Sequence, residues 1–176
     1  MHQGYNTEQL GFKLAQEYNG TNYAVFYSHG NREKHDSPSL CHPEPFFDKF
    51  SMFTSLSIVD IVILNTGTRR VELIVEIEES QPVPKTIIGD VMNITLSDRI
   101  HIKGTDYYYS SPLLFLFAAE VKRDQKTERI LKELDAINKK LGKNIELLPP
   151  ILSSNVSDVI EGVEKEIKRR FPPIKK

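Results

Sequence analysis

The sequence predicts an α/β fold in which a mixed β-sheet is flanked by helices. Three patterns predict it. Apolar residues recur at helical spacing in several segments, runs of β-branched residues are bounded by turn residues, and one near-continuous apolar run has the composition of a strand buried on both faces. No repeat, low-complexity tract or linker divides the 176 residues. We therefore expect a single domain over 1–176, with its core at about 7–150 and a C-terminal helix at about 155–170.

The first part of the chain predicts a helix, a short strand and a loop. Leu10, Leu14 and Tyr18 stand at helical spacing behind Asn6, which is a candidate cap. The elements expected are a helix at 7–18, a strand at 23–27 and a surface loop at 30–45, whereas the apolar residues at 46–53 show no clean period.

The clearest local signal is a hairpin. A β-branched run at 58–64 is followed by turn residues at 65–70 and a second strand at 71–79. The elements expected beyond it are a helix from about 85 to 93 with Pro84 at its first position, an extended segment at 98–103, a buried strand at 113–121, a helix over Ile130 to Leu141 ended by Gly142, a short strand at 145–148 and a last helix after Asn155. The resulting order is α-β-β-β-α-β-α-β-α.

Composition narrows the classes of protein to consider. A net charge of −1 argues against a strong non-selective nucleic-acid binder, because phosphate contacts require a basic excess. A single cysteine excludes an internal disulfide framework, which favours the cytoplasm. The longest apolar stretch, at 112–119, is too short to cross a bilayer, so no membrane association is expected.

The hairpin carries carboxylates in unusual places. Because strand side chains alternate, Glu76 and Glu78 project from the same face of the second strand, roughly 6 to 7 Å apart. Asp60 interrupts the apolar run of the first strand, where a charge lowers stability unless it is paired or solvated. The alternative is that Glu72, Glu76 and Glu78 form an ordinary polar face open to solvent.

The length of the turn decides whether Asp60 meets the glutamates. A five-residue turn places Asp60 directly opposite Glu76, and a three-residue turn keeps it on the same face, diagonal to Glu76. A two- or four-residue turn sends Asp60 to the other face. Where the three carboxylates meet, their repulsion calls for a cation or a shared proton, and oxygen ligands favour Mg²⁺ or Mn²⁺.

These residues and the order of elements resemble the PD-(D/E)XK nuclease superfamily, which has the restriction-endonuclease-like fold. The family signature is an aspartate on one strand and an acidic residue, any residue and a lysine on the next, followed by a helix. Asp60 matches the aspartate, Glu76 the acidic residue and Glu78 the usual lysine position. The resemblance covers most of 7–150 and implies a metal site formed by Asp60, Glu76 and Glu78.

The sequence departs from the family at the lysine. Some members use an acidic residue there, and others supply a lysine from the next helix, which makes Lys85 the candidate substitute for stabilising developing charge. The family's N-terminal helix often adds an acidic residue, and Glu8 is the candidate. Arg69 and Arg70, at the hairpin tip, are candidates for phosphate contacts, with solvated charge as the alternative.

The function expected is hydrolysis of phosphodiester bonds, in DNA, by a Mg²⁺- or Mn²⁺-dependent nuclease. Cutting a duplex needs two sites, which is compatible with a homodimer, and the near-neutral charge favours a protein partner or a narrow target. The first alternative is an inactive nuclease-fold module that binds a nucleic acid or protein partner, with Glu78 marking the loss of catalysis. The second is an unrelated α/β protein with a polar strand face.

Overall fold

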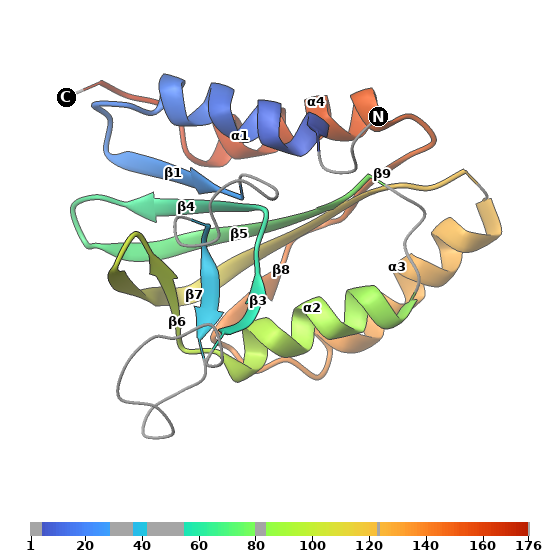
Figure 1. Ribbon diagram of the computed structural model, residues 1–176. Helices are drawn as coiled ribbons and strands as arrows, with labels where there is room; N and C mark the ends of the chain where they lie inside the picture. The colour runs from blue at the N-terminus through green and yellow to red at the C-terminus, as the bar shows by residue number, and fades with distance from the viewer. Residues whose placement is uncertain (1–4, 29–36, 42–54, 80–83, 123, 176) are drawn as a thin grey trace.

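The computed structural model describes residues 5–28, 37–41, 55–79, 84–122 and 124–175 (Figure 1). The helices in these ranges are α1 (Tyr5–Glu17), α2 (Pro84–Leu96), α3 (Asp124–Asn138) and α4 (Val156–Arg170). The strands are β1 (Tyr23–Tyr27), β2 (Ser39–Cys41), β3 (Ser55–Ile58), β4 (Ile61–Asn65), β5 (Arg70–Glu78), β6 (Arg99–Ile102), β7 (Thr105–Glu120), β8 (Ile145–Leu147) and β9 (Ile151–Ser153).

The strands form one mixed, mostly antiparallel, open sheet. Its order is β1-β4-β5-β7-β6-β2-β3, and β8 and β9 pair with β7. The long strand β7 joins the parts of the sheet: its first residues pair antiparallel with β6, and its later residues pair parallel with β5, β8 and β9. The predicted class, an α/β protein with a mixed sheet flanked by helices, is therefore confirmed.

The helices cover both faces of the sheet (Figure 1). Helices α1 and α4 lie side by side on one face, and α2 and α3 lie on the other. On the first side, Leu14 of α1 and Val163 of α4 pack with Leu73 and Val75 of β5. On the second side, Ile87 and Val91 of α2 and Ile130 of α3 pack with Ile74, Phe115 and Phe117. No helix in the described ranges has the length and apolarity needed to cross a bilayer.

All four predicted helices are present, but the strands are more numerous than expected. The β-branched run at 58–64 divides between β3 and β4, with Val59 and Asp60 between them. Strand β7 begins at Thr105, earlier than the predicted 113, because its first residues pair with β6 although they are not part of the apolar run. The expected loop at 30–45 contains β2, and the unassigned segment at 46–53 lies outside the described residues.

The start of α1 differs from the prediction. Asn6 does not cap the helix, since α1 begins at Tyr5 and the Asn6 side chain donates a hydrogen bond to Glu79 at 2.9 Å. At α4, Asn155 is a true N-cap, because its side chain accepts a hydrogen bond of 2.9 Å from the Ser157 amide. The cap of α4 is therefore Asn155, which directly precedes the helix, whereas the first turn of α1 binds Glu79, which is distant in sequence.

Candidate functional site

The register of the β4–β5 hairpin brings Asp60 opposite Glu76. Asn65 pairs with Arg70, so the turn has four residues, 66–69, a length expected to send Asp60 to the wrong face. A β-bulge restores the parity, because Leu64 pairs with Val71 while Ile63 pairs with Leu73, leaving Glu72 as an extra residue. From Ile63 the pairing runs evenly to Ile61 opposite Val75, and one more step sets Asp60 opposite Glu76.

The bulge also corrects the predicted faces of β5. Strict alternation would place Val71 on the same face as Leu73 and Val75, but Val71 packs with Ile74 on the α2 side of the sheet. The extra residue, Glu72, reverses the alternation on the turn side of Leu73. Glu72 itself accepts a hydrogen bond of 2.7 Å from the Asn65 side chain, so it belongs to the turn and not to the carboxylate site.

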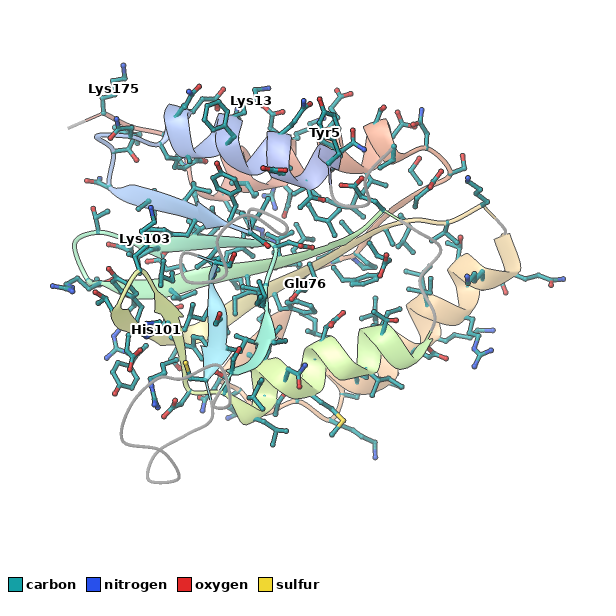
Figure 2. The ribbon with its side chains drawn as sticks, viewed as in Figure 1. Tyr5, Lys13, Glu76, His101, Lys103 and Lys175 are labelled. Carbon is teal, nitrogen blue, oxygen red and sulfur yellow. The ribbon has the colours of Figure 1, made fainter. Side chains whose placement is uncertain are left out.

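Asp60 and Glu76 are in direct contact. Their side chains are hydrogen-bonded to each other, and the backbone amide of Asp60 also bonds to Glu76. The second carboxylate oxygen of Asp60, Oδ2, accepts the Ile77 amide at 2.7 Å. Both residues are partly buried, and Glu76 lies on the side of the sheet that faces α2 (Figure 2). A bond between two carboxyl groups requires that one of them carry a proton, so the pair holds a proton in the absence of a cation.

A third carboxylate, Asp90 of α2, reaches this pair. Burial, followed by the charges of Asp60 and Glu78, raises the pKa of Asp90 to about 7. Asp90 was not among the predicted site residues. The helical spacing of α2 does indicate its position, because Ile87, Val91 and Ile94 are buried and position 90 falls on the same inward face.

The surroundings of the three carboxylates disfavour their charged forms. Burial raises the pKa of Asp60 to about 6, with the charges of Glu78 and Glu79 adding to the effect. Burial, Asp60 and Asp90 raise the pKa of Glu76 well above its ordinary value. In the described part of the chain, no lysine, arginine or histidine forms an ion pair with Asp60, Glu76 or Asp90.

The donor set suits a hard divalent cation. Carboxylate oxygens are the ligands that Mg²⁺ and Mn²⁺ prefer, and a pair that already shares a proton can exchange it for a metal ion. Among the described residues, however, no three His, Cys, Asp or Glu side chains stand close enough in this conformation to hold one ion. The observed core of the site is therefore the Asp60–Glu76 pair, with Asp90 near it.

The other predicted site residues are placed as follows. Glu78, the last residue of β5, is partly buried and contributes negative charge at both Asp60 and Asp90. Lys85 lies in the first turn of α2, but its side chain falls outside the described residues, so its role stays a prediction. Glu8, in the first turn of α1, adds to the effect of burial in raising the pKa of Tyr27, and its role at the carboxylate site stays a prediction.

The two arginines lie at the opposite end of the hairpin from the carboxylates. The Arg69 guanidinium stands 5.8 Å from the centre of the Tyr107 ring, and Arg70 Nη1 donates to the Tyr109 carbonyl at 2.7 Å. Both arginines are exposed, but each is engaged with β7. Of the aromatic residues there, Tyr107 and Tyr109 pack against the core, while Tyr108 is 48% exposed.

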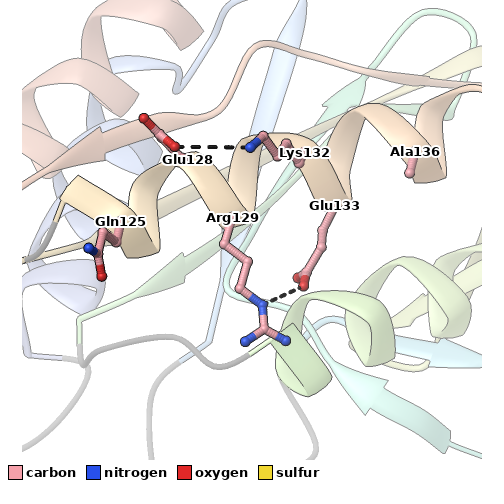
Figure 3. A pocket seen from close by; sticks show the side chains of 6 residues that line it. All are labelled: Gln125, Glu128, Arg129, Lys132, Glu133 and Ala136. Carbon is pink, nitrogen blue, oxygen red and sulfur yellow. Dashed lines mark hydrogen bonds and ion pairs between the residues drawn. The ribbon is translucent and has the colours of Figure 1, made fainter.

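A shallow hollow of about 390 Å³ lies on α3, away from these carboxylates (Figure 3). Its lining comes from one helix: Gln125, Glu128, Arg129, Lys132, Glu133 and Ala136. The charged residues pair with each other one turn apart, Arg129 with Glu133 at 3.0 Å and Lys132 with Glu128 at 4.0 Å. The hollow has the chemistry of a solvated helix face.

We therefore infer the function of the chain from the chemistry of Asp60, Glu76 and Asp90. Comparisons with models of known protein families, with curated proteins and with solved structures gave no significant match for this chain.

Proposed function

We propose that the protein is a metal-dependent nuclease of the restriction-endonuclease-like type that hydrolyses phosphodiester bonds in DNA. The observation that carries the proposal is the contact between the Asp60 and Glu76 carboxyl groups, partly buried and without a basic ion-pair partner among the described residues. Buried carboxylates destabilise a fold unless something compensates their charge, so an arrangement of this kind is retained where it binds a cation.

The residues divide into distinct roles. Asp60 and Glu76 would hold Mg²⁺ or Mn²⁺, and the ion would polarise a phosphoryl oxygen and lower the pKa of bound water. Asp90 and Glu78 border the pair and would orient the attacking water through their oxygens. Lys85, in the first turn of α2, would stabilise the negative charge that develops on the phosphate.

The order of elements supports the family resemblance. Helix α1 precedes the β4–β5 hairpin, α2 follows it, and β7 pairs parallel with β5 before α3. This is the order of helix, hairpin, helix, strand and helix that the resemblance implies. Asp60 and Glu76 lie at the open end of the hairpin, where the signature would place them. Cutting both strands of a duplex would involve two copies of the chain.

The test is cleavage of single-stranded and duplex DNA in Mg²⁺ or Mn²⁺ by wild type and by Asp60→Asn. Asparagine retains an oxygen that can accept the Ile77 amide, so this variant removes charge while preserving the local hydrogen bond. We expect Asp60→Asn and Glu76→Gln each to lower the cleavage rate by about 100-fold or more. The exposed Glu128→Gln on α3 serves as the matched control and should cleave like wild type. Equal cleavage by wild type and Asp60→Asn would contradict the proposal.

A second candidate is a binding module on the same fold that has lost catalysis. It is favoured by Glu78, which stands where the resemblance expects lysine and adds negative charge at Asp60 and Asp90. Thermal unfolding in millimolar Mg²⁺ or Mn²⁺ separates the two, because a ligand that binds only the folded state raises its stability. A rise in Tm that disappears in Glu76→Gln supports the nuclease. The absence of any rise, together with no cleavage, supports the binding module.

A further inference from the structure

Glu79 joins the site-bearing strand to the start of α1. It directly follows β5, and its carboxylate accepts three hydrogen bonds from α1: from the Thr7 amide at 2.7 Å, from Thr7 Oγ1 at 2.7 Å and from Asn6 Nδ2 at 2.9 Å. The partners are more than 70 residues apart in sequence. Thr7 is 4% exposed, so the bonds lie at a sheltered point of the molecule.

The alternation of side chains along the strand explains why neighbouring glutamates face different sides of the sheet. Side chains alternate along a strand, so Glu78 lies on the same side as Glu76, whereas Glu79 follows Ile77 toward the α1 side. The first amides of a helix lack partners within the helix and carry partial positive charge. They therefore bind the Glu79 carboxylate and compensate its charge, which is the role that a local N-cap residue usually fills.

The end of β5 is also attached to its neighbours in the sheet. Beyond the pairing of Val75 with Ile61, β4 provides no further strand partner. Residues 76–78 pair with β7 on one side, opposite Phe117, Ala118 and Ala119. On the other side the Ile77 amide bonds to the Asp60 side chain. The bonds from Glu79 to α1 are a further attachment, one residue beyond the strand.

We propose that Glu79 is a positioning residue whose bonds to Asn6 and Thr7 hold the end of β5 in register, so that Glu76, Glu78 and the Ile77 amide keep their places around Asp60. The inference rests on the proposed metal-dependent function. It assigns α1 a role at the site through Glu79.

The variants separate position from charge, because Glu79 also lies close enough for its charge to act on Asp60. Glu79→Asp keeps the charge but shortens the side chain, so it should lose contact with Thr7. Glu79→Gln keeps the length and one acceptor oxygen but removes the charge. Thr7→Val removes one hydrogen bond from α1 without changing any charge or any residue of the hairpin. The control is Asn155→Ala, which removes the cap of α4 and leaves β5 untouched.

The first measurement is Mn²⁺ affinity of the full chain by titration calorimetry. Replacing a residue that orients metal ligands weakens binding by about 10- to 100-fold. We therefore expect Glu79→Asp to bind about tenfold more weakly than wild type and Thr7→Val several-fold more weakly, with Glu79→Gln closer to wild type than Glu79→Asp and Asn155→Ala unchanged. Wild-type affinity in both Glu79→Asp and Thr7→Val would overturn the inference while leaving the proposed function intact. A greater loss in Glu79→Gln than in Glu79→Asp would also overturn it, in favour of a simple charge effect.

The second measurement is hydrogen exchange at the Ile77 amide without metal. Faster exchange in Glu79→Asp than in Asn155→Ala is expected, because the end of β5 would open more often. Equal exchange rates at the Ile77 amide in Glu79→Asp and Asn155→Ala would overturn the inference. If the wild type binds no Mn²⁺ at all, the proposed function fails, and the positioning role falls with it.

Discussion

Two acidic clusters on the same sheet differ in how their charge is compensated. At the open end of the hairpin, burial and nearby carboxylates raise the pKa values of Asp60, Glu76 and Asp90, and these residues form no ion pair with a basic side chain of the described residues. On the β6–β7 hairpin, Asp98 and Asp106 flank Arg99, which bonds to them at 3.0 and 3.1 Å. His101 contacts the same Asp106 at 2.6 Å, and Figure 2 places it well away from Glu76.

The difference separates a structural cluster from a candidate binding site. Arg99 is only 5% exposed; burial lowers its pKa, but the charges of Asp98 and Asp106 outweigh burial and raise it. That cluster carries its own cation and has no need of another. Among the described residues the open-end cluster has no such cation, so protons or a cation from solution can compensate it, and it should respond to metal and pH where the other does not.

The largest expected effect comes from breaking the compensated cluster. Arg99→Met removes the buried cation and leaves Asp98 and Asp106 facing each other. The aspartate side chains are 43% and 37% exposed, so water would relieve part of the repulsion. We expect the free energy of unfolding to fall by about 2 to 3 kcal/mol, at the low end for a broken buried pair. Urea denaturation measures it. A metal-induced gain in stability that survives in this variant would confirm that the two clusters are independent, and an unchanged urea midpoint would contradict the comparison.

At the open end of the hairpin, we expect a substitution to raise the free energy of unfolding of the metal-free protein. Glu76→Gln replaces a carboxyl that must hold a proton with an amide that can donate to Asp60 without one. At about pH 8 the metal-free protein should gain stability, because burial and the charges of Asp60 and Asp90 raise the pKa of Glu76 and the folded wild type must hold a proton that the unfolded chain releases. The same variant should lose the stabilisation by Mn²⁺. A large destabilisation without metal would instead make Glu76 a structural residue.

The pH dependence of stability should also distinguish the clusters. The pKa values of Asp60 and Asp90 are raised from 3.8 to about 6 and about 7. In this interval the folded state binds more protons than the unfolded state, so the stability contributed by these groups is complete below about pH 4 and is lost as the pH rises through about 6 to 7. Thermal unfolding from about pH 5 to pH 8 should therefore show a smaller decline in Asp90→Asn than in wild type. Parallel curves for the two proteins would refute the assignment of Asp90 to the cluster.

The smallest effect is expected at the hairpin tip. Asn65 Oδ1 accepts the amides of Gly67 and Thr68 at 3.0 and 3.1 Å, and its Nδ2 donates to Glu72 at 2.7 Å. Asn65→Ala should lower the free energy of unfolding by about 1 kcal/mol, the usual value of such bonds. Since the tip helps to set the register of Asp60, the Tm gain with Mn²⁺ should decrease slightly as well. Glu72→Gln keeps an acceptor for Asn65 and should retain that gain.

Local sequence patterns were enough to predict much of the fold. The 4-3-4 spacing of Val156, Ile160, Val163 and Ile167 predicted α4, and the β-branched runs predicted the β4–β5 hairpin. The full length of β7 was missed because its first residues, such as Asp106 and Tyr108, are exposed and gain their strand character from pairing with β6. Such pairing is non-local, so no short window of sequence carries it.

The candidate site was predicted in part. Asp60 stood out because it interrupts an apolar run, and Glu76 because it projects from the same strand face as Glu78. The structure brings Asp60 and Glu76 into contact. The turn rule alone would have separated them, since the bulge at Glu72 depends on cross-strand hydrogen bonding and on the Asn65 side chain. The roles of Asp90 and Glu79 depend on how α2 and α1 dock, which the spacing of apolar residues indicates only in outline.

The bulge at Glu72 also limits how this hairpin can change length during evolution. Loss of Glu72 would remove the extra residue and the bulge together, and the pairs from Asn65–Arg70 to Ile61–Val75 could then follow one another without interruption. A residue gained or lost between Leu73 and Glu76 would instead move Glu76 to the other face of the sheet, away from Asp60. Relatives of this chain that retain the site should therefore vary in length at Glu72 or in the turn, and not between Leu73 and Glu76.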